Sequence, residues 1–132
     1  MSHIPPLSIF ILDDDLDFGN KLLYHLKSNA GYNVKLFTDS DECLQQLSQS
    51  PDVIIVDYHL DGNMKNDSNG LVVLDKIKGS DPDIHVIMLT QLKHYGIAAQ
   101  TIAKGAEQCV IKDDDSLKNI EAIVEAINNE RK

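Results

Sequence analysis

Residues Pro51 to Asp61 read PDVIIVDYHLD, and this stretch decides the fold. Its apolar and β-branched run, Val53–Val56, leads directly into Asp57. Because the run is apolar at successive positions, both faces of a strand built from it are apolar, which predicts a buried parallel strand. Ligands of open α/β sheets bind at the carboxyl ends of the strands, so Asp57 is predicted to lie at a site.

Segments of the same kind flank this strand along the chain. After a lead-in over residues 1–7, which contains two prolines, further strands are predicted over 8–12, 34–37, 84–89 and 107–111. The segments between and after the strands carry apolar residues at helical spacing: Phe18, Leu22, Leu23 and Leu26; Cys43, Leu44 and Leu47; residues 71–78; residues 95–104; and Leu117, Ile120, Ile123, Val124 and Ile127.

This alternation of strands and helices predicts one α/β domain over residues 1–132. The expected fold is flavodoxin-like and doubly wound, with a five-stranded parallel sheet in the order 2-1-3-4-5 and five helices on its two faces. Helix caps are predicted at Asp15, within residues 38–40, and at Asp115 or Ser116.

A polar loop without periodicity follows the central strand, over residues His59–Asn69. Its Asp61-Gly62 and Asn69-Gly70 pairs are typical of turns. Gly79 and Gly105 are predicted to end the third and fourth helices, since glycine is common just past a helix.

Composition narrows the class of protein. The 132 residues are 42% hydrophobic and 25% charged, with a net charge of −9. This charge disfavours direct binding to nucleic acid and favours divalent cations or basic protein faces. The sequence shows neither a membrane-length apolar run nor a secretory leader, and Cys43 and Cys109 lack metal-ligand spacing. We therefore expect a cytoplasmic protein with both thiols reduced.

Polar residues follow four of the five predicted strands. They are Asp13 and Asp14, Asp57, Thr90, and Lys112. In the strand order 2-1-3-4-5 these strand ends are neighbours around one crevice. Carboxylates that gather there repel one another, and a hard divalent cation such as Mg²⁺ relieves the repulsion. With phosphoryl charge neutralised, Asp57 can act as a nucleophile, while Lys112 and Thr90 hold the phosphate.

The chain resembles the response-regulator receiver domains of two-component signalling over essentially its whole length. The resemblance is carried by FILDDD, VIIVDYHL, VIMLTQ and CVIKD. It implies that Asp57 accepts a phosphoryl group from a phosphohistidine of a sensor histidine kinase or a histidine phosphotransfer protein. It further implies direct Mg²⁺ ligation by Asp14, Asp57 and the backbone carbonyl of His59, with Asp13 acting through water.

The same resemblance implies how the signal leaves the domain. Thr90 and Lys112 would act on the face made by the fourth helix, fifth strand and fifth helix, where a downstream protein would bind. Family members usually carry an aromatic switch residue at the position of Cys109, a small residue at Gln91 and proline at Asp113. The loop after Asp57 is also longer than usual and carries Asp61 where proline is common.

These departures keep other functions open. One alternative is a pseudo-receiver, a protein-binding module that works without phosphorylation. Another is a phosphatase with an aspartyl-phosphate intermediate, but His59 stands where such enzymes carry a second carboxylate. We expect a signalling switch that catalyses at most its own phosphorylation and dephosphorylation. His59 is also a candidate for controlling access of water to the acyl phosphate.

Overall fold

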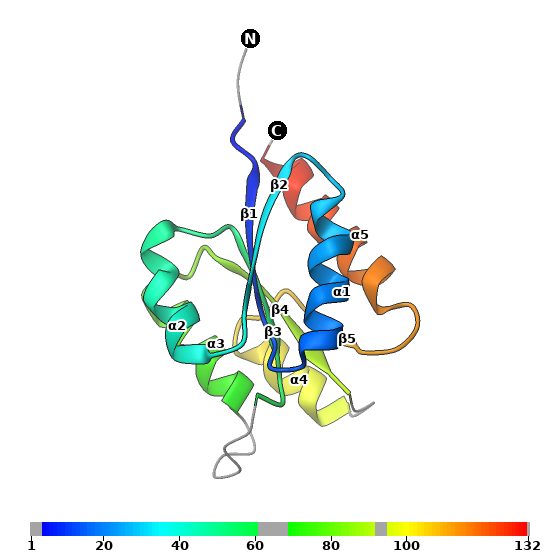
Figure 1. The fold of residues 1–132 in the computed structure, drawn as a ribbon. Coiled ribbons are helices and arrows are strands. Elements are labelled where there is room, and N and C mark those ends of the chain that lie inside the picture. The colour runs from blue at the N-terminus through cyan, green and yellow to red at the C-terminus, as the bar shows by residue number, and fades with distance from the viewer. Residues whose placement is uncertain (1–3, 61–68, 92–94, 132) are drawn as a thin grey trace.

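Five parallel strands form one sheet at the centre of the molecule (Figure 1). A computed structural model describes residues 4–60, 69–91 and 95–131. The strands are β1 (Leu7–Leu12), β2 (Tyr32–Phe37), β3 (Val53–Asp57), β4 (His85–Thr90) and β5 (Gln108–Ile111). They are ordered β2-β1-β3-β4-β5, and every neighbouring pair is parallel. The predicted sheet order is confirmed.

Helices cover both faces of this sheet. They are α1 (Leu16–Lys27), α2 (Ser40–Gln45), the short 3₁₀ helix η1 (Gln46–Gln49), α3 (Asn69–Ser80), α4 (Tyr95–Ala103) and α5 (Ser116–Glu130). Figure 1 shows α1 and α5 on one side of the sheet and α2 and α3 on the other. None of the helices in the described segments is both long and apolar enough to cross a membrane.

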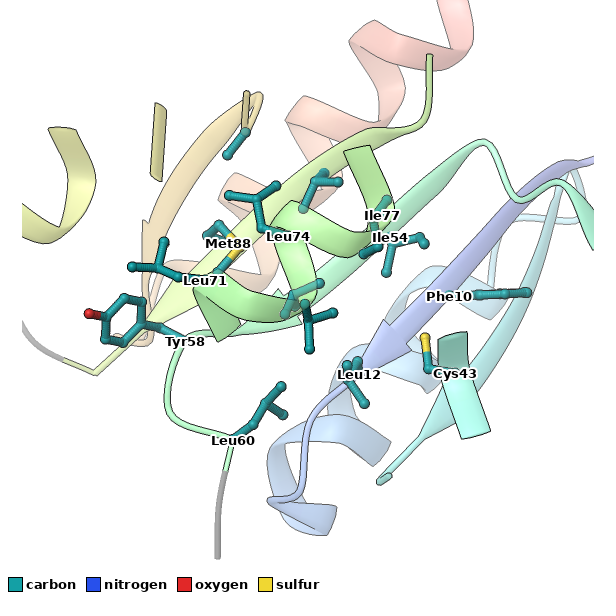
Figure 2. Packing of buried hydrophobic residues seen from close by; sticks show 14 of the residues in the cluster. Phe10, Leu12, Cys43, Ile54, Tyr58, Leu60, Leu71, Leu74, Ile77 and Met88 are labelled. Carbon is teal, nitrogen blue, oxygen red and sulfur yellow. The ribbon is translucent and has the colours of Figure 1, made fainter. Parts of the chain in front are cut away.

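The sheet separates two hydrophobic clusters, because successive side chains of a strand point to opposite faces. One cluster joins β1, β3 and β4 to α3 and includes Phe10, Ile54, Met88 and Leu74 (Figure 2). The other joins the same strands to α1 and α5 and includes Ile9, Ile55, Leu22 and Ile120. All five residues of β3 are buried, as expected for a strand covered on both faces.

Side-chain caps begin the first two helices at the predicted places. The Asp15 carboxylate accepts hydrogen bonds from the backbone N–H groups of Asp17 and Phe18, at 3.1 and 3.3 Å. Asp39 accepts one from the N–H of Asp41 at 3.1 Å. Each carboxylate satisfies N–H groups that have no partner within the helix, and its negative charge suits the helix N-terminus.

The predicted lead-in over residues 1–7 is one residue too long. Leu7 belongs to β1, where its N–H donates to the carbonyl of Gly31 at 2.8 Å and its side chain is fully buried. Burial of this side chain and pairing with Tyr32 extend the strand to Leu7, past the prolines.

Two glycine-based predictions are wrong. Asn69-Gly70 is not a turn but the first part of α3, and Gly79 does not end that helix, which runs to Ser80. Gly105 does follow the end of α4 in a left-handed conformation, with φ of 105°. The remainder of the predicted loop, residues 61–68, lies outside the described residues.

The ends of α2 and α5 also differ from the prediction. The helix that carries Cys43 ends at Gln45, and Leu47 packs against the core from η1 instead. Asp115 occupies the cap position of α5, but its side chain makes no capping hydrogen bond. Asp113 holds this turn instead, because its carboxylate accepts from the N–H of Asp115 at 2.9 Å.

Candidate functional site

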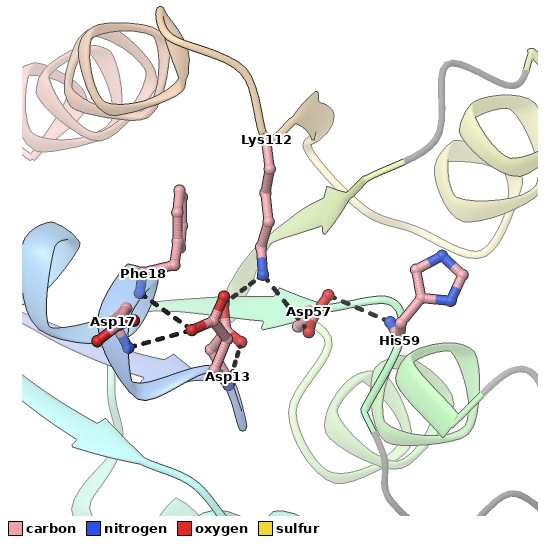
Figure 3. A network of polar contacts seen from close by, with 7 residues as sticks. Asp13, Asp17, Phe18, Asp57, His59 and Lys112 are labelled. Carbon is pink, nitrogen blue, oxygen red and sulfur yellow. Dashed lines mark hydrogen bonds and ion pairs between the residues drawn. The ribbon is translucent and has the colours of Figure 1, made fainter.

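The fold brings the polar strand ends to one edge of the sheet. Asp13 follows β1, Asp57 ends β3, Thr90 ends β4 and Lys112 follows β5. Carboxylate oxygens of Asp13, Asp14 and Asp57 all lie within 4.8 Å of one another. The predicted gathering of the paired acids, the central aspartate and the lysine is therefore present. Figure 3 shows Asp13, Asp57 and Lys112 of this cluster.

Lys112 forms the positive centre of this cluster. Its Nζ lies 2.8 Å from Oδ2 of Asp13 and 3.6 Å from Oδ2 of Asp57. The Lys112 side chain is 6% exposed, and both carboxylate side chains are at most 4% exposed. Charges buried to this degree are stable only when they are paired, so the three side chains depend on one another.

The turn after β1 fixes the acidic pair. The Oδ1 atom of Asp13 accepts a hydrogen bond from the N–H of Asp15 at 2.9 Å. Asp13 is fully buried, whereas Asp14 is exposed. Asp13 is therefore held rigidly beside Asp57, and Asp14 faces the open side of the cluster.

The surroundings of Asp57 raise the pKa of its carboxyl group. Its pKa is raised from 3.8 to about 7, chiefly by burial and next by the charge of Asp13. The Lys112 ammonium and the N–H of His59, which donates to Oδ1 at 3.2 Å, act in the opposite direction. A cation brought to this cluster would favour the ionised carboxylate that a nucleophile requires.

Backbone hydrogen bonds connect the end of β4 to the residues after β5. The N–H of Lys112 donates to the carbonyl of Thr90 at 2.8 Å, and the Thr90 side chain is buried. Asp113, at the position where proline is usual, donates its own N–H to Ile111 and accepts from Ser116 at 3.1 Å. These bonds fix the backbone on both sides of Lys112.

His59 lies next to the cluster through its backbone. Its imidazole is exposed and packs edge-on against Tyr58, with ring centroids 4.9 Å apart. The predicted metal-binding role of its carbonyl oxygen and the predicted effect of the ring on water access remain predictions.

The region of the expected output face has a cysteine in place of an aromatic ring. Cys109 in β5 is half-buried and packs against the α2–α4 side of the core. Burial raises the pKa of its thiol, and a hydrogen bond with Thr101 of α4 partly opposes this. Gln91, where a small residue is usual, is exposed.

Two residues near the cluster were not predicted as functional. Phe18 follows the apolar pattern of a core residue, but its ring centroid lies 4.7 Å from the Lys112 Nζ. Gly70 follows asparagine as a turn glycine does, but a Cβ atom there would lie 2.6 Å from the carbonyl oxygen of Asp57. Both relationships join segments far apart in the chain, and no local pattern reports them.

The donor set suits a hard divalent ion. Its atoms are carboxylate oxygens, which are the ligands that Mg²⁺ and Ca²⁺ prefer, and two of the three acids are buried. After burial, the charge of Asp13 is the next cause that raises the pKa of Asp57, and a bound cation would relieve this repulsion. Asp13, Asp14 and Asp57 therefore fit a divalent cation.

Comparisons with known proteins agree on the fold and identify the family. The family model described as the response regulator receiver domain matches residues 9–127. The C4-dicarboxylate transport transcriptional regulatory protein DctD of Rhizobium meliloti is 32% identical over 85% of this chain, which spans only 23% of DctD. The chemotaxis protein CheY of Listeria monocytogenes is 23% identical over 91% of this chain and 98% of its own length.

Solved structures support the same fold. The receiver domain of the Francisella response regulator 1452 superposes with a TM-score of 0.81 at 18% identity, covering 95% of this chain and 98% of that domain. Such low identity shows the fold alone, whereas the family match spans most of this chain. The chain belongs to the response regulator receiver domain family.

Proposed function

We propose that this receiver domain is a switch whose Asp57 accepts a phosphoryl group from a phosphohistidine. The donor would be a sensor histidine kinase or a histidine phosphotransfer protein. The observation that carries the proposal is the position of Asp57 between the buried Lys112 ammonium and two further acids, Asp13 and Asp14. A carboxylate placed in this way can attack phosphorus, and the charge that arrives with the phosphoryl group has a partner in Lys112.

The reaction transfers one phosphoryl group from the donor's imidazole to Asp57. An oxygen of Asp57 forms a bond to phosphorus as the bond from phosphorus to the donor's imidazole nitrogen breaks, and the imidazole keeps the electron pair. Asp14, Asp57 and the His59 carbonyl would hold Mg²⁺ directly, and Asp13 would hold it through water. When bound, the ion neutralises phosphoryl oxygens during transfer.

The protein's own side chains then hold the product. Lys112, whose Nζ is 3.6 Å from Asp57, can pair with an added phosphoryl oxygen after small movements. Thr90 ends the neighbouring strand and offers a hydroxyl donor. Because the Thr90 carbonyl accepts from the Lys112 N–H, the two phosphate-holding residues are already joined.

The signal would leave through α4, β5 and α5, where a downstream protein would bind. Cys109 lies on β5 and contacts Thr101 on α4, so this face is linked by a small thiol rather than by an aromatic ring. A groove of about 480 Å³ runs between β5 and α5 and is lined in part by Cys109, Ile111 and Ile123.

We also propose that residues 1–132 work as one receiver domain in the cytoplasm, where the free thiols of Cys43 and Cys109 stay reduced. In this role the chain catalyses at most its own phosphorylation and dephosphorylation. Neither nucleic acid nor membrane is expected to bind this acidic segment directly.

A second candidate function is the pseudo-receiver, a binding module that works without phosphorylation. Three departures favour it: Cys109 stands where an aromatic switch residue is usual, Gln91 where a small residue is usual, and Asp113 where proline is usual. Lys112 disfavours it, because its buried ammonium lies beside Asp13 and Asp57, where it can pair with a phosphoryl group.

Intact-mass measurement separates the two functions. The protein is incubated with Mg²⁺ and acetyl phosphate, beside a sample in EDTA and an Asp57→Asn sample. A switch gains one phosphoryl group in the first sample only. No gain in any sample would identify a pseudo-receiver.

A further inference from the structure

We propose that Phe18 is a positioning residue that holds the Lys112 ammonium in place for the phosphoryl group at Asp57. This inference rests on the proposed function, and it adds a role for an aromatic ring on α1. The Lys112 Nζ lies over the Phe18 ring, 4.7 Å from its centroid (Figure 3).

The ring and the acids surround the ammonium together. Asp13 and Asp57 lie 2.8 and 3.6 Å from Nζ, and the Phe18 ring supplies a further neighbour from α1. An ammonium group has three N–H donors and no acceptor. The face of an aromatic ring carries negative potential, so it attracts the cation without offering a competing hydrogen-bond acceptor.

Burial makes this contact effective. The Lys112 side chain is 6% exposed, and Phe18 is half-buried against the α1–α5 side of the core. A ring at this position takes space that water would otherwise occupy beside the ammonium. Cation–π attraction strengthens when the cation is desolvated, as it is here.

The contact also suits a reaction in which Lys112 changes partner. The ammonium is closer to Asp13 than to Asp57 before phosphorylation. To pair with a phosphoryl oxygen it must turn away from Asp13, and a ring face permits such turning because it attracts the cation without a fixed acceptor atom. Phe18 thus keeps the ammonium in the pocket while leaving its donors free to redirect.

The turn between β1 and α1 places the Phe18 ring near Asp13. Asp13 accepts from the N–H of Asp15, and Asp15 in turn accepts from the N–H of Phe18. Gly19 then lets α1 approach β2 closely, because a Cβ atom there would lie 2.9 Å from a methyl carbon of Leu36. The single turn from β1 into α1 therefore fixes both sides of the Lys112 environment.

The first measurement needs neither metal nor phosphoryl donor. In protein labelled with ¹³C,¹⁵N-lysine, the Lys112 ε-methylene protons should appear at high field, shielded by the ring. Lys112→Met identifies the signal by its loss. We expect the signal to move among those of the other lysines in Phe18→Leu and to stay shielded in Phe18→Tyr. An unchanged Lys112 signal in Phe18→Leu would overturn the proposal.

The second measurement follows the rate of phosphorylation by acetyl phosphate with Mg²⁺. We expect Phe18→Leu to be roughly five- to tenfold slower than wild type and Phe18→Tyr to stay within about twofold. Leu23→Ala is the matched control, because Leu23 is a half-buried residue of α1 that packs against the same cluster, and its rate should equal that of wild type. Equal losses in Phe18→Leu and Phe18→Tyr contradict a role for the ring.

The two measurements separate this inference from the proposed function. Wild-type protein that accepts no phosphoryl group contradicts the proposed function. The lysine signals of the unphosphorylated variants then decide by themselves whether the ring holds the ammonium.

Discussion

Gly70 packs against the backbone of Asp57 so closely that a Cβ atom would lie 2.6 Å from the Asp57 carbonyl oxygen. The same atom would lie 2.6 Å from Cα of Tyr58, and the Gly70 N–H donates to the Tyr58 carbonyl at 3.1 Å. The start of α3 is thereby joined to the end of β3. Only glycine fits between a helix and a strand at this separation.

We therefore predict that Gly70→Ala destabilises the protein by about 2–4 kcal/mol, since backbone must move to admit the methyl group. Urea unfolding measures the change. Gly79→Ala is the matched control in the same helix, because a Cβ there meets nothing within 4 Å. It should stabilise the protein by about 0.5–1 kcal/mol. Equal effects at both positions would show that α3 does not approach Asp57 as described.

The titration of Asp57 gives a dependence of stability on pH. Its folded-state pKa of about 7 lies above the ordinary value of 3.8. From about pH 4 to about 7 the folded state therefore binds more protons at this group than the unfolded chain, and ionisation costs stability. This group makes the free energy of unfolding of metal-free protein fall as the pH rises through that window.

Asp57→Asn removes this cost. In EDTA we expect the variant to be more stable than wild type by about 2 kcal/mol at pH 8, with the difference shrinking as the pH falls to 5. Urea unfolding at the two pH values measures it, and exposed Asp17→Asn serves as the control. A difference that grows as the pH falls would mean that the pKa of Asp57 is lowered instead.

Divalent cations should stabilise the protein through the acidic cluster. At a free Mg²⁺ concentration ten times its dissociation constant, the gain is about 1.4 kcal/mol. Thermal unfolding with and without Mg²⁺ measures this gain for wild type, Asp13→Asn, Asp57→Asn and Asp17→Asn. We expect the first two variants to lose it and Asp17→Asn, altered at an exposed acid outside the cluster, to keep it. A gain that survives in both cluster variants places the ion elsewhere.

The imidazole of His59 offers a test of the lifetime of the phosphorylated state. The ring is exposed, and its residue donates a backbone N–H to Asp57. Removal of the ring in His59→Ala should admit water more readily and shorten the half-life of the acyl phosphate by roughly two- to fivefold. Decay of the phosphorylated species is followed by intact mass after removal of the donor. Equal half-lives would assign the ring no role.

Sequence patterns predicted the sheet because its strands carry their own signal. Val53–Val56 and Ile9–Leu12 are apolar on both faces, which only a doubly covered strand requires, and alternation with helices then restricts the order. Asp13, Asp57 and Lys112 could be assigned to one pocket because parallel strands end at the same edge.

The glycines show where such patterns fail. Gly79 and Gly105 both follow a stretch with helical periodicity, but Gly79 lies within α3, and of the two only Gly105 adopts the left-handed conformation. Gly70 follows asparagine as turn glycines do, yet its role is a contact with β3. The ring of Phe18 likewise has a helical-core pattern, and its contact with Lys112 depends on how α1 meets the end of β5. These features depend on tertiary packing, which the periodic pattern of apolar residues in a sequence does not predict.

Identification of the carboxylate that carries phosphorus tests the role of Asp57 directly. After incubation with Mg²⁺ and acetyl phosphate, borohydride reduces an acyl phosphate to an alcohol and releases phosphate, which converts the modified aspartate into homoserine. Peptide mass spectrometry then locates that residue. We predict homoserine at position 57 alone, with none in an EDTA sample. Homoserine at position 13 or 14, or at no position in protein incubated with Mg²⁺, would contradict the account.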